Sequence, residues 1–150
     1  MTVMDFQTFW YADEQFPLDP GATEAELNEV EMALRIKLPD AYKQLLRISN
    51  GGIPNYSGVP LPVQSPEGES HAIFIGGLRG TTELMKSPAI VRNWEMPKDL
   101  ILISGNCHHN IALRLSNAGC AVVYYEADSE TVIELAKSFD DFLEMLEPSE

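Results

Sequence analysis

Apolar residues recur at helical spacing in EAELNEVEMAL, residues 24–34, with acidic residues between them. Thr23 stands just before this segment and Glu26 follows three residues later, a spacing typical of a capping box that satisfies backbone N–H groups at a helix start. We therefore expect a helix that begins at Glu24. Its buried face contains Leu27, Val30 and Leu34, whereas Glu24, Glu29 and Glu31 point mostly toward water.

A second helix is expected in LPDAYKQLLRISNGG, residues 38–52. Pro39 suits the first helical turn, where its missing N–H would have no partner in any case. The helix should end at Asn50, Gly51 and Gly52, because asparagine and glycine adopt a left-handed backbone at low cost. Its expected inner face contains Tyr42, Leu45, Leu46 and Ile48.

The segment from Gly51 to Ser70 contains four glycines and four prolines. Proline cannot donate a ladder hydrogen bond, so this density indicates a long loop rather than regular central strands. Residues 72–75 form a short apolar run that predicts a strand. A helical stretch should follow from residue 81 or 82, limited by two later prolines, with Trp94 packed inside.

The second half of the chain contains apolar and alternating runs that are typical of strands. Residues 100–104 predict a buried strand, and residues 111–116 predict a half-buried one. Residues 117–119 predict a three-residue turn into a returning strand, 120–126. Residues 131–135 add another strand.

The last helix is expected to begin after Ser138, whose hydroxyl can accept a hydrogen bond from the first turn. Apolar residues at helical spacing form its inner face: Phe139, Phe142, Leu143 and Leu146. Acidic residues occupy the opposite side: Asp140, Glu144 and Glu147. Like the first helix, it presents apolar side chains to a core and carboxylates to water.

The chain has 150 residues, 45% of them hydrophobic and 22% charged, which suits one globular domain with a substantial core. We therefore expect residues 1–150 to form a single domain. The N-terminal residues lack the basic and apolar regions of a signal peptide, and no run approaches the roughly 20 apolar residues of a membrane-spanning helix. These features predict a cytoplasmic protein with no membrane partner and with two reduced cysteines.

The net charge of −13 is concentrated at the two ends of the chain. Residues 1–34 contain eight acidic residues and no lysine or arginine, and residues 126–150 contain nine acidic residues and one lysine. The negative electrostatic field of these acidic residues argues against a nucleic-acid partner, because phosphates need a basic face. It suits a basic protein partner, but charge taken alone favours the simpler explanation that acidic helix faces keep the protein soluble.

Cys107, His108 and His109 form the only stretch where a thiol and two imidazoles stand together. Zinc needs about four ligands, and neighbouring residues of an extended segment point different ways, so this cluster would supply about two. A thiol nucleophile would need a base that is close in space, not only in sequence. No further metal-ligand pair and no phosphate-binding or hydrolase motif accompanies the cluster. Because it follows Gly105 and Asn106, we favour a turn between strands with no catalytic, metal or cofactor role.

Three motifs together resemble the SUKH superfamily, which includes fungal cell-wall assembly regulators of the Smi/Knr type and many bacterial immunity proteins. They are the run ATEAELNEVEMALRIKLPDAYKQLLRISNGG, the strands LILISGN and NIALRLS to VVYYE in that order, and the closing AKSFDDFLEML. The resemblance covers about residues 20–147. It implies an α+β domain in which helices pack against a mixed, mostly antiparallel sheet, and it implies no catalysis or cofactor.

Several residues match framework positions of that superfamily: Pro39, Tyr42, Gly51, Gly52, Phe139 and Phe142. Each of them also has a structural explanation as a helix joint, a core residue or a helix end. Relatives tend to have small or acidic turn residues where this chain has Cys107, His108 and His109. The resemblance therefore gives these three residues no inherited role.

The resemblance and the charge together suggest an immunity protein, an antitoxin that binds and neutralises a secreted toxin domain such as a nuclease. Nuclease domains commonly expose a basic surface for phosphate, with which an acidic inhibitor associates rapidly. The alternative is a regulatory adaptor of the fungal type. It ranks second because we expect that type to carry long flexible extensions around this domain, whereas this sequence continues only a few residues beyond its last predicted helix. The expected partner-binding residues, with segment 53–70 beside them, are Glu24, Glu29, Glu31, Asp140, Glu144 and Glu147.

Overall fold

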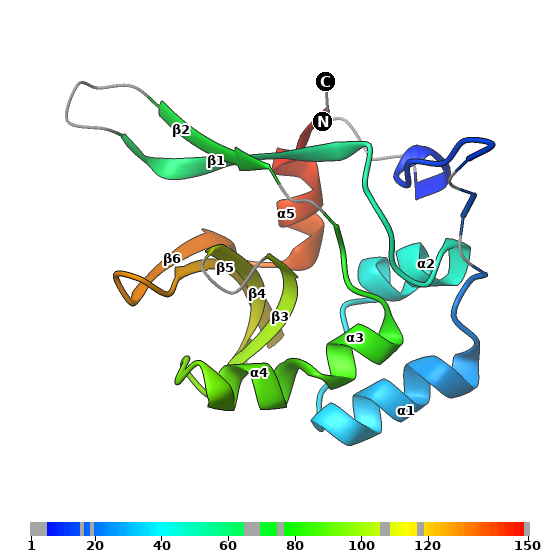
Figure 1. The fold of residues 1–150 in the computed structure, drawn as a ribbon, viewed down its shortest axis with the longest axis horizontal. Coiled ribbons are helices and arrows are strands. Elements are labelled where there is room, and N and C mark those ends of the chain that lie inside the picture. The colour runs from blue at the N-terminus through cyan, green and yellow to red at the C-terminus, as the bar shows by residue number, and fades with distance from the viewer. Residues whose placement is uncertain are drawn as a thin grey trace.

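The computed structural model describes residues 6–15, 17–18, 20–64, 70–74, 77–105, 109–116 and 119–148. In chain order its elements are η1 (Phe6–Thr8), α1 (Glu24–Leu34), α2 (Asp40–Ile48), β1 (Tyr56–Gln64), β2 (Ser70–Phe74), α3 (Thr81–Met85), α4 (Ser87–Asn93), β3 (Leu100–Gly105), β4 (His109–Ser116), β5 (Gly119–Glu126), β6 (Thr131–Ala136), α5 (Phe139–Met145) and β7 (Glu147–Pro148). Figure 1 shows β1 and β2 above the strands β3 to β6, with α1, α3 and α4 at the opposite end. Helices and strands follow one another mostly in runs rather than in strict alternation, and the four-stranded sheet is antiparallel, which confirms the predicted α+β class.

The three helices expected from periodicity and capping signals are present. Helix α1 begins as predicted, because Thr23 Oγ1 accepts a hydrogen bond from Glu26 N–H at 3.1 Å and the Glu26 carboxylate accepts one from Thr23 N–H at 2.9 Å. Helix α2 follows Pro39, which is its N-cap rather than its first helical residue. Helix α5 follows Ser138, whose hydroxyl accepts a hydrogen bond from Asp141 N–H at 3.1 Å.

The four-stranded sheet has the order β3-β4-β5-β6, and all of its neighbouring strands are antiparallel. Its two faces are both covered, so strand β4 is not half-buried as its alternation predicts. Ile111 and Leu113 belong to the main core with residues of α1, α2 and α5, whereas Ala112 belongs to a second cluster with Val91 of α4 and with Met96. The helices before and after the sheet therefore pack against it from both sides.

The predicted loop from Gly51 to Ser70 is wrong in its central part. Strand β1 occupies residues 56–64 of this segment and pairs antiparallel with β2, which corresponds to the strand predicted at residues 72–75. A second sheet with the order β2-β1-β7 results. Pro60 and Pro62 lie beyond Tyr56–Gly58, the part of β1 that pairs with β7. Because Pro60 and Pro62 are two residues apart, their backbone nitrogens face the same side of the strand. Proline has no N–H to donate, so it is tolerated where that side has no described partner strand.

Two smaller predictions also need correction. Trp94 is 44% exposed rather than packed inside, because α4 ends at Asn93 and the left-handed residue Glu95 (φ 54°) turns the chain so that Met96 is buried instead. The hairpin between β4 and β5 has a two-residue connection, since Gly119 pairs with Ser116. In the part of the chain that the structure describes, no helix is long and apolar enough to cross a membrane.

Candidate protein-binding site

The six acidic residues predicted to bind a partner fall into two groups on different elements. Glu24, Glu29 and Glu31 lie on α1, Asp140 and Glu144 lie on α5, and Glu147 lies in β7, where its side chain is outside the described part. Helix α2 lies between the groups, because its Lys43 and Arg47 pair with α1 while its Tyr42 stacks on Phe139 of α5. The sequence-predicted residues therefore do not form one continuous acidic face.

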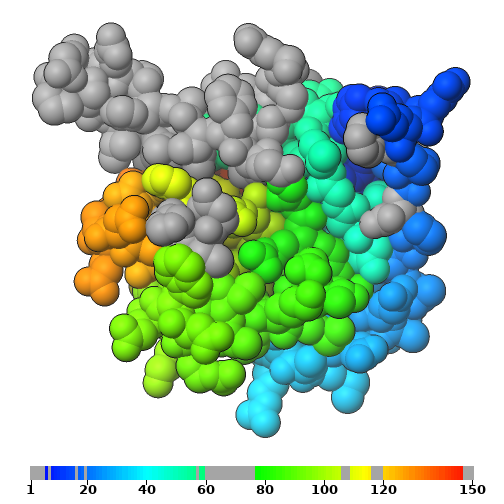
Figure 2. Space-filling model, in the orientation of Figure 1, coloured from blue at the N-terminus to red at the C-terminus, as the bar shows by residue number. Residues whose placement is uncertain are grey.

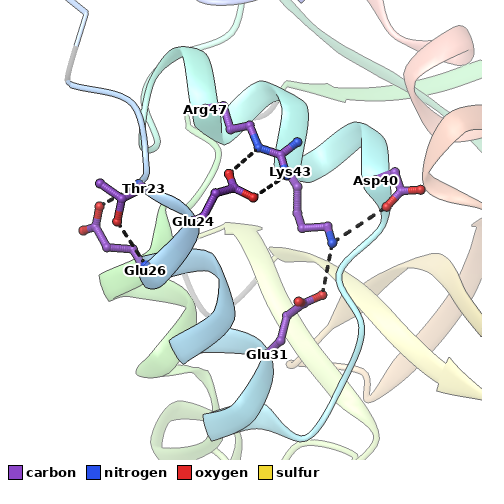
Figure 3. Close-up of polar contacts among 7 residues, drawn as sticks. All are labelled: Thr23, Glu24, Glu26, Glu31, Asp40, Lys43 and Arg47. Atoms are coloured by element: carbon purple, nitrogen blue, oxygen red, sulfur yellow. Dashed lines mark hydrogen bonds and ion pairs between the residues drawn. The ribbon is translucent and has the colours of Figure 1, made fainter.

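Glu24 forms an ion pair with Arg47 of the neighbouring helix α2 (Figure 3). Arg47 Nε lies 2.7 Å from Glu24 Oε2 and Arg47 Nη2 lies 3.0 Å from Oε1, so the guanidinium binds both carboxylate oxygens. These hydrogen bonds lower the pKa of the Glu24 carboxyl below its ordinary value. Glu24 is exposed as expected, but its charge is largely matched by Arg47.

Glu31 does not point mostly toward water, contrary to the sequence expectation. Its side chain is only 10% exposed, and its carboxylate accepts a hydrogen bond from Leu38 N–H at 2.7 Å. Lys43 Nζ lies 3.5 Å from the same carboxylate and 3.8 Å from Asp40 (Figure 3). A buried carboxylate needs such partners, so Glu31 holds the connection between α1 and α2 in place.

Asp140 and Glu144 of the predicted set border a groove between α2 and α5, whereas Glu29 is exposed on α1. The groove has a volume of about 320 Å³ and is lined by Phe6, Asp40, Ala41, Gln44, Asp140, Leu143 and Glu144. Three carboxylates therefore surround a partly apolar floor, and no lysine or arginine is among the lining residues. Such a groove suits a cationic side chain with an aliphatic stem, because the stem contacts the floor while the charge meets the carboxylates.

The groove residues that sequence reasoning missed are Phe6, Asp40, Ala41 and Gln44. Asp40 reads in the sequence only as an acidic residue in the first turn of α2. Its proximity to Asp140 and Glu144 depends on the packing of α2 against α5, which joins residues about a hundred positions apart. The apolar spacing of each helix predicts that it packs, but not which helix lies beside it.

The cluster of Cys107, His108 and His109 is described only at its last residue. His109 belongs to β4 and pairs with Glu126, so it is not part of the connection between strands as predicted. Its Nδ1 lies 2.6 Å from the Tyr124 hydroxyl, which lies 3.4 Å from Glu126 Oε2. Cys107 and His108 lie outside the described residues, and among those that are described no group of three or more His, Cys, Asp or Glu could hold a metal ion.

The pKa values of the Tyr124 hydroxyl and the Cys120 thiol are both shifted in the direction that disfavours their nucleophilic anions. Partial burial, with a contribution from Glu126, raises the pKa of the Tyr124 hydroxyl. Burial also raises the pKa of the Cys120 thiol. A nucleophilic phenol or thiol needs the opposite shift, which stabilises its anion at neutral pH.

We expect Cys120 to react slowly with iodoacetamide at neutral pH. The half-buried thiol has a raised pKa and therefore a small thiolate fraction, so alkylation in the folded protein should be about tenfold slower than in urea. Mass spectrometry of the peptide that contains Cys120 measures this rate separately from that of Cys107. Equal rates in the folded and unfolded protein would contradict the burial argument.

The comparison with protein families identifies the family of this chain. The sequence model of the SMI1 / KNR4 family (SUKH-1) matches residues 21–145, whereas a search of curated proteins gives no match. The family includes immunity proteins and Knr4-type regulators and is generally non-catalytic. The matched residues run from just before α1 to the end of α5 and so include both walls of the groove. This match over most of the sequence shows that the chain belongs to the SMI1 / KNR4 family (SUKH-1).

Proposed function

We propose that the protein is an immunity protein of the cytoplasm that binds a toxin domain, such as a nuclease, and blocks it. The observation that carries the proposal is the groove between α2 and α5, in which Asp40, Asp140 and Glu144 surround an apolar floor. The family includes immunity proteins, which supports the same assignment. The toxin would present basic residues to the groove.

The distribution of paired and unpaired charge narrows the proposed interface. Glu24 already interacts with Arg47, and Glu31 and Asp40 both interact with Lys43. A partner would have to displace these bases before it gained the charge of the three carboxylates. Desolvating an existing ion pair costs free energy that a new pair must first offset. We therefore centre the interface on Asp140 and Glu144, with Glu29 and Glu147 of the predicted set as extensions of it.

Co-expression with a candidate toxin tests the function directly. Genes next to the one that encodes this protein supply the candidates, and each toxin domain is expressed in a sensitive host with and without the protein. The proposal expects growth to be restored and the two proteins to purify together. Absence of rescue by a well-folded protein would contradict an immunity function, and capture of housekeeping proteins without any toxin would favour the adaptor instead.

Neutralising the groove should slow association with the toxin. The double variant Asp140→Asn, Glu144→Gln removes two charges with little change of shape, so the association rate constant should fall about tenfold at low salt. The difference should shrink as ionic strength rises and the Debye length shortens to about 10 Å or less. Stopped-flow measurement at several salt concentrations determines both effects.

A matched variant separates the groove from the overall charge. Glu95→Gln with Glu134→Gln also removes two exposed acidic charges, but at the end of α4 and on β6. It should change the association rate less than twofold or so. A further variant, Glu29→Gln, measures whether the interface reaches α1. Equal slowing by the groove variant and the matched variant would show that only net charge matters.

A further inference from the structure

A second surface feature involves the large hydrophobic residues that are most exposed in the described chain. These are Tyr11, Leu18, Met32, Ile53 and Trp94. Met32 and Trp94 stand on separate elements, which is ordinary for single exposed apolar residues. Tyr11, Leu18 and Ile53 instead line one pocket of about 130 Å³, although they are 43% to 53% exposed. Clustering of this kind marks an interaction site more often than scattered exposure does.

The pocket is a built feature of the fold. The Tyr11 N–H donates to the Ile53 carbonyl at 2.7 Å, and Trp10 Nε1 donates to the Leu45 carbonyl at 2.9 Å, so the N-terminal segment is fixed to α2 and to the chain after it. A Cβ at Gly52 would lie 3.3 Å from the Trp10 ring, so the absence of a side chain there keeps one wall of the pocket open. Figure 2 shows the N-terminal segment, in blue, on the surface beside the turquoise part of the chain.

The charge around the pocket determines what could cover it. Asp13 and Glu14 are exposed in the segment that supplies Tyr11 and Leu18, and the Tyr11 hydroxyl donates to the Asp13 carboxylate. No lysine or arginine is among the lining residues, and residues 1–34 contain none at all. A second copy of this chain would bring the same acidic segment and be repelled. A partner with basic residues around an apolar anchor is complementary to the pocket.

We propose that this pocket is a second docking point, which receives an apolar side chain that lysine or arginine residues flank on a basic protein partner. The proposal rests on the proposed function, since we assign the anchor to the same toxin domain. Ala41 of α2 lines the groove, and Ser49, the residue after α2, lines the pocket. At a helical rise of 1.5 Å per residue, the two positions are roughly 12 Å apart along the helix axis. An interface of about 800 Å² per partner is wide enough to cover both.

Binding of a small probe tests the chemistry of the pocket without any toxin. The probe is a short peptide in which one tryptophan is flanked by lysines, added to the isotopically labelled full chain. Backbone amide shifts in two-dimensional NMR spectra should change mainly at Tyr11, Leu18, Gly52 and Ile53. A peptide with serine in place of tryptophan should lose most of this effect, and one with glutamates in place of the lysines should bind about tenfold more weakly.

Two variants test whether the peptide binds at the apolar wall that Leu18 and Ile53 form. Leu18→Ser with Ile53→Ser should weaken peptide binding about tenfold, whereas Met32→Ser, which removes an even more exposed apolar side chain on α1, should leave it unchanged. The proposal is overturned if the peptide gives no localised shifts, or if the serine peptide gives the same ones. It is also overturned if the shifts depend on protein concentration without peptide, which would indicate a second copy on this surface.

The toxin then separates this inference from the proposed function. Rescue of growth by the wild-type chain but not by the Leu18→Ser, Ile53→Ser variant supports the second docking point. Full rescue and unchanged affinity with that variant would remove the second docking point and leave the immunity function intact. Failure of the wild-type chain to rescue contradicts the immunity function, whereas the peptide result stands on its own evidence.

Discussion

Replacing Tyr42 by alanine should lower the free energy of unfolding by about 4 kcal/mol, because large-to-small changes of buried aromatic residues cost about 3–5 kcal/mol. Tyr42 is fully buried in α2, and its ring stacks on Phe139 of α5 with ring centroids 4.9 Å apart. Its hydroxyl donates to the Arg79 carbonyl at 2.7 Å, which joins α2 to the segment before α3. The substitution would therefore leave a cavity and an acceptor without its donor.

The conservative variant separates the two contributions. Tyr42→Phe keeps the ring and should cost about 1–2 kcal/mol, the usual penalty for a buried polar group that loses its partner. Urea unfolding followed by circular dichroism measures both variants against the wild type. A loss below about 1 kcal/mol for Tyr42→Ala would show that the contact between α2 and α5 is less important than its geometry indicates.

The same tyrosine gives a pH dependence of defined sign. Burial raises the pKa of the Tyr42 hydroxyl above its ordinary value of about 10, so the unfolded chain releases this proton at lower pH than the folded chain does. The stabilisation from the neutral hydroxyl is therefore fully present below about pH 10 and declines as the pH rises further. Tyr42→Phe should lose stability less steeply than the wild type above that pH.

The elements that the sequence predicted well are those specified by nearby residues. Helices α1 and α5 follow from a cap and a helical apolar pattern that both lie within a few residues. Strands β3 to β6 follow from apolar or alternating runs. Strand β1 was missed because proline density normally argues against a strand, and only the pairing of β1 with two partners of unequal length makes its prolines acceptable.

The candidate site was predictable only as chemistry, not as geometry. Acidic residues at positions such as Glu24, Glu31 and Asp140 are visible in the sequence, and the basic partner that we propose is inferred from them. Whether a carboxylate remains available depends on bases far along the chain, as Arg47 shows for Glu24 and Lys43 shows for Glu31. The periodicity of one helix contains no information about these neighbours. The sequence-based prediction therefore treated acidic residues with and without a basic partner in the same way.

Replacing Gly80 by alanine should destabilise the protein by about 3 kcal/mol, at the upper end for overpacking. A Cβ at this position would lie 2.2 Å from the Asn50 carbonyl oxygen and 2.7 Å from Asn50 Oδ1. The Asn50 side chain holds the start of α3, because its Oδ1 accepts from Thr81 N–H at 2.8 Å and its Nδ2 donates to Thr81 Oγ1 at 2.9 Å. Backbone cannot rotate away as a side chain can, so the turn at Asn50 to Gly52 would have to move off α3.

Gly77→Ala is the matched control for this clash. Its Cβ would meet only the Gly52 carbonyl oxygen, at the ordinary contact distance of 3.4 Å, so its effect should lie between no change and a gain of about 1 kcal/mol. Urea unfolding compares the two variants, and amide shifts of Gly51 and Gly52 report whether the turn has moved. Because Gly52 borders the apolar pocket, Gly80→Ala should also weaken binding of the tryptophan peptide, whereas Gly77→Ala should not. Equal stability of the two alanine variants would show that the junction between the turn and α3 is looser than its contacts indicate.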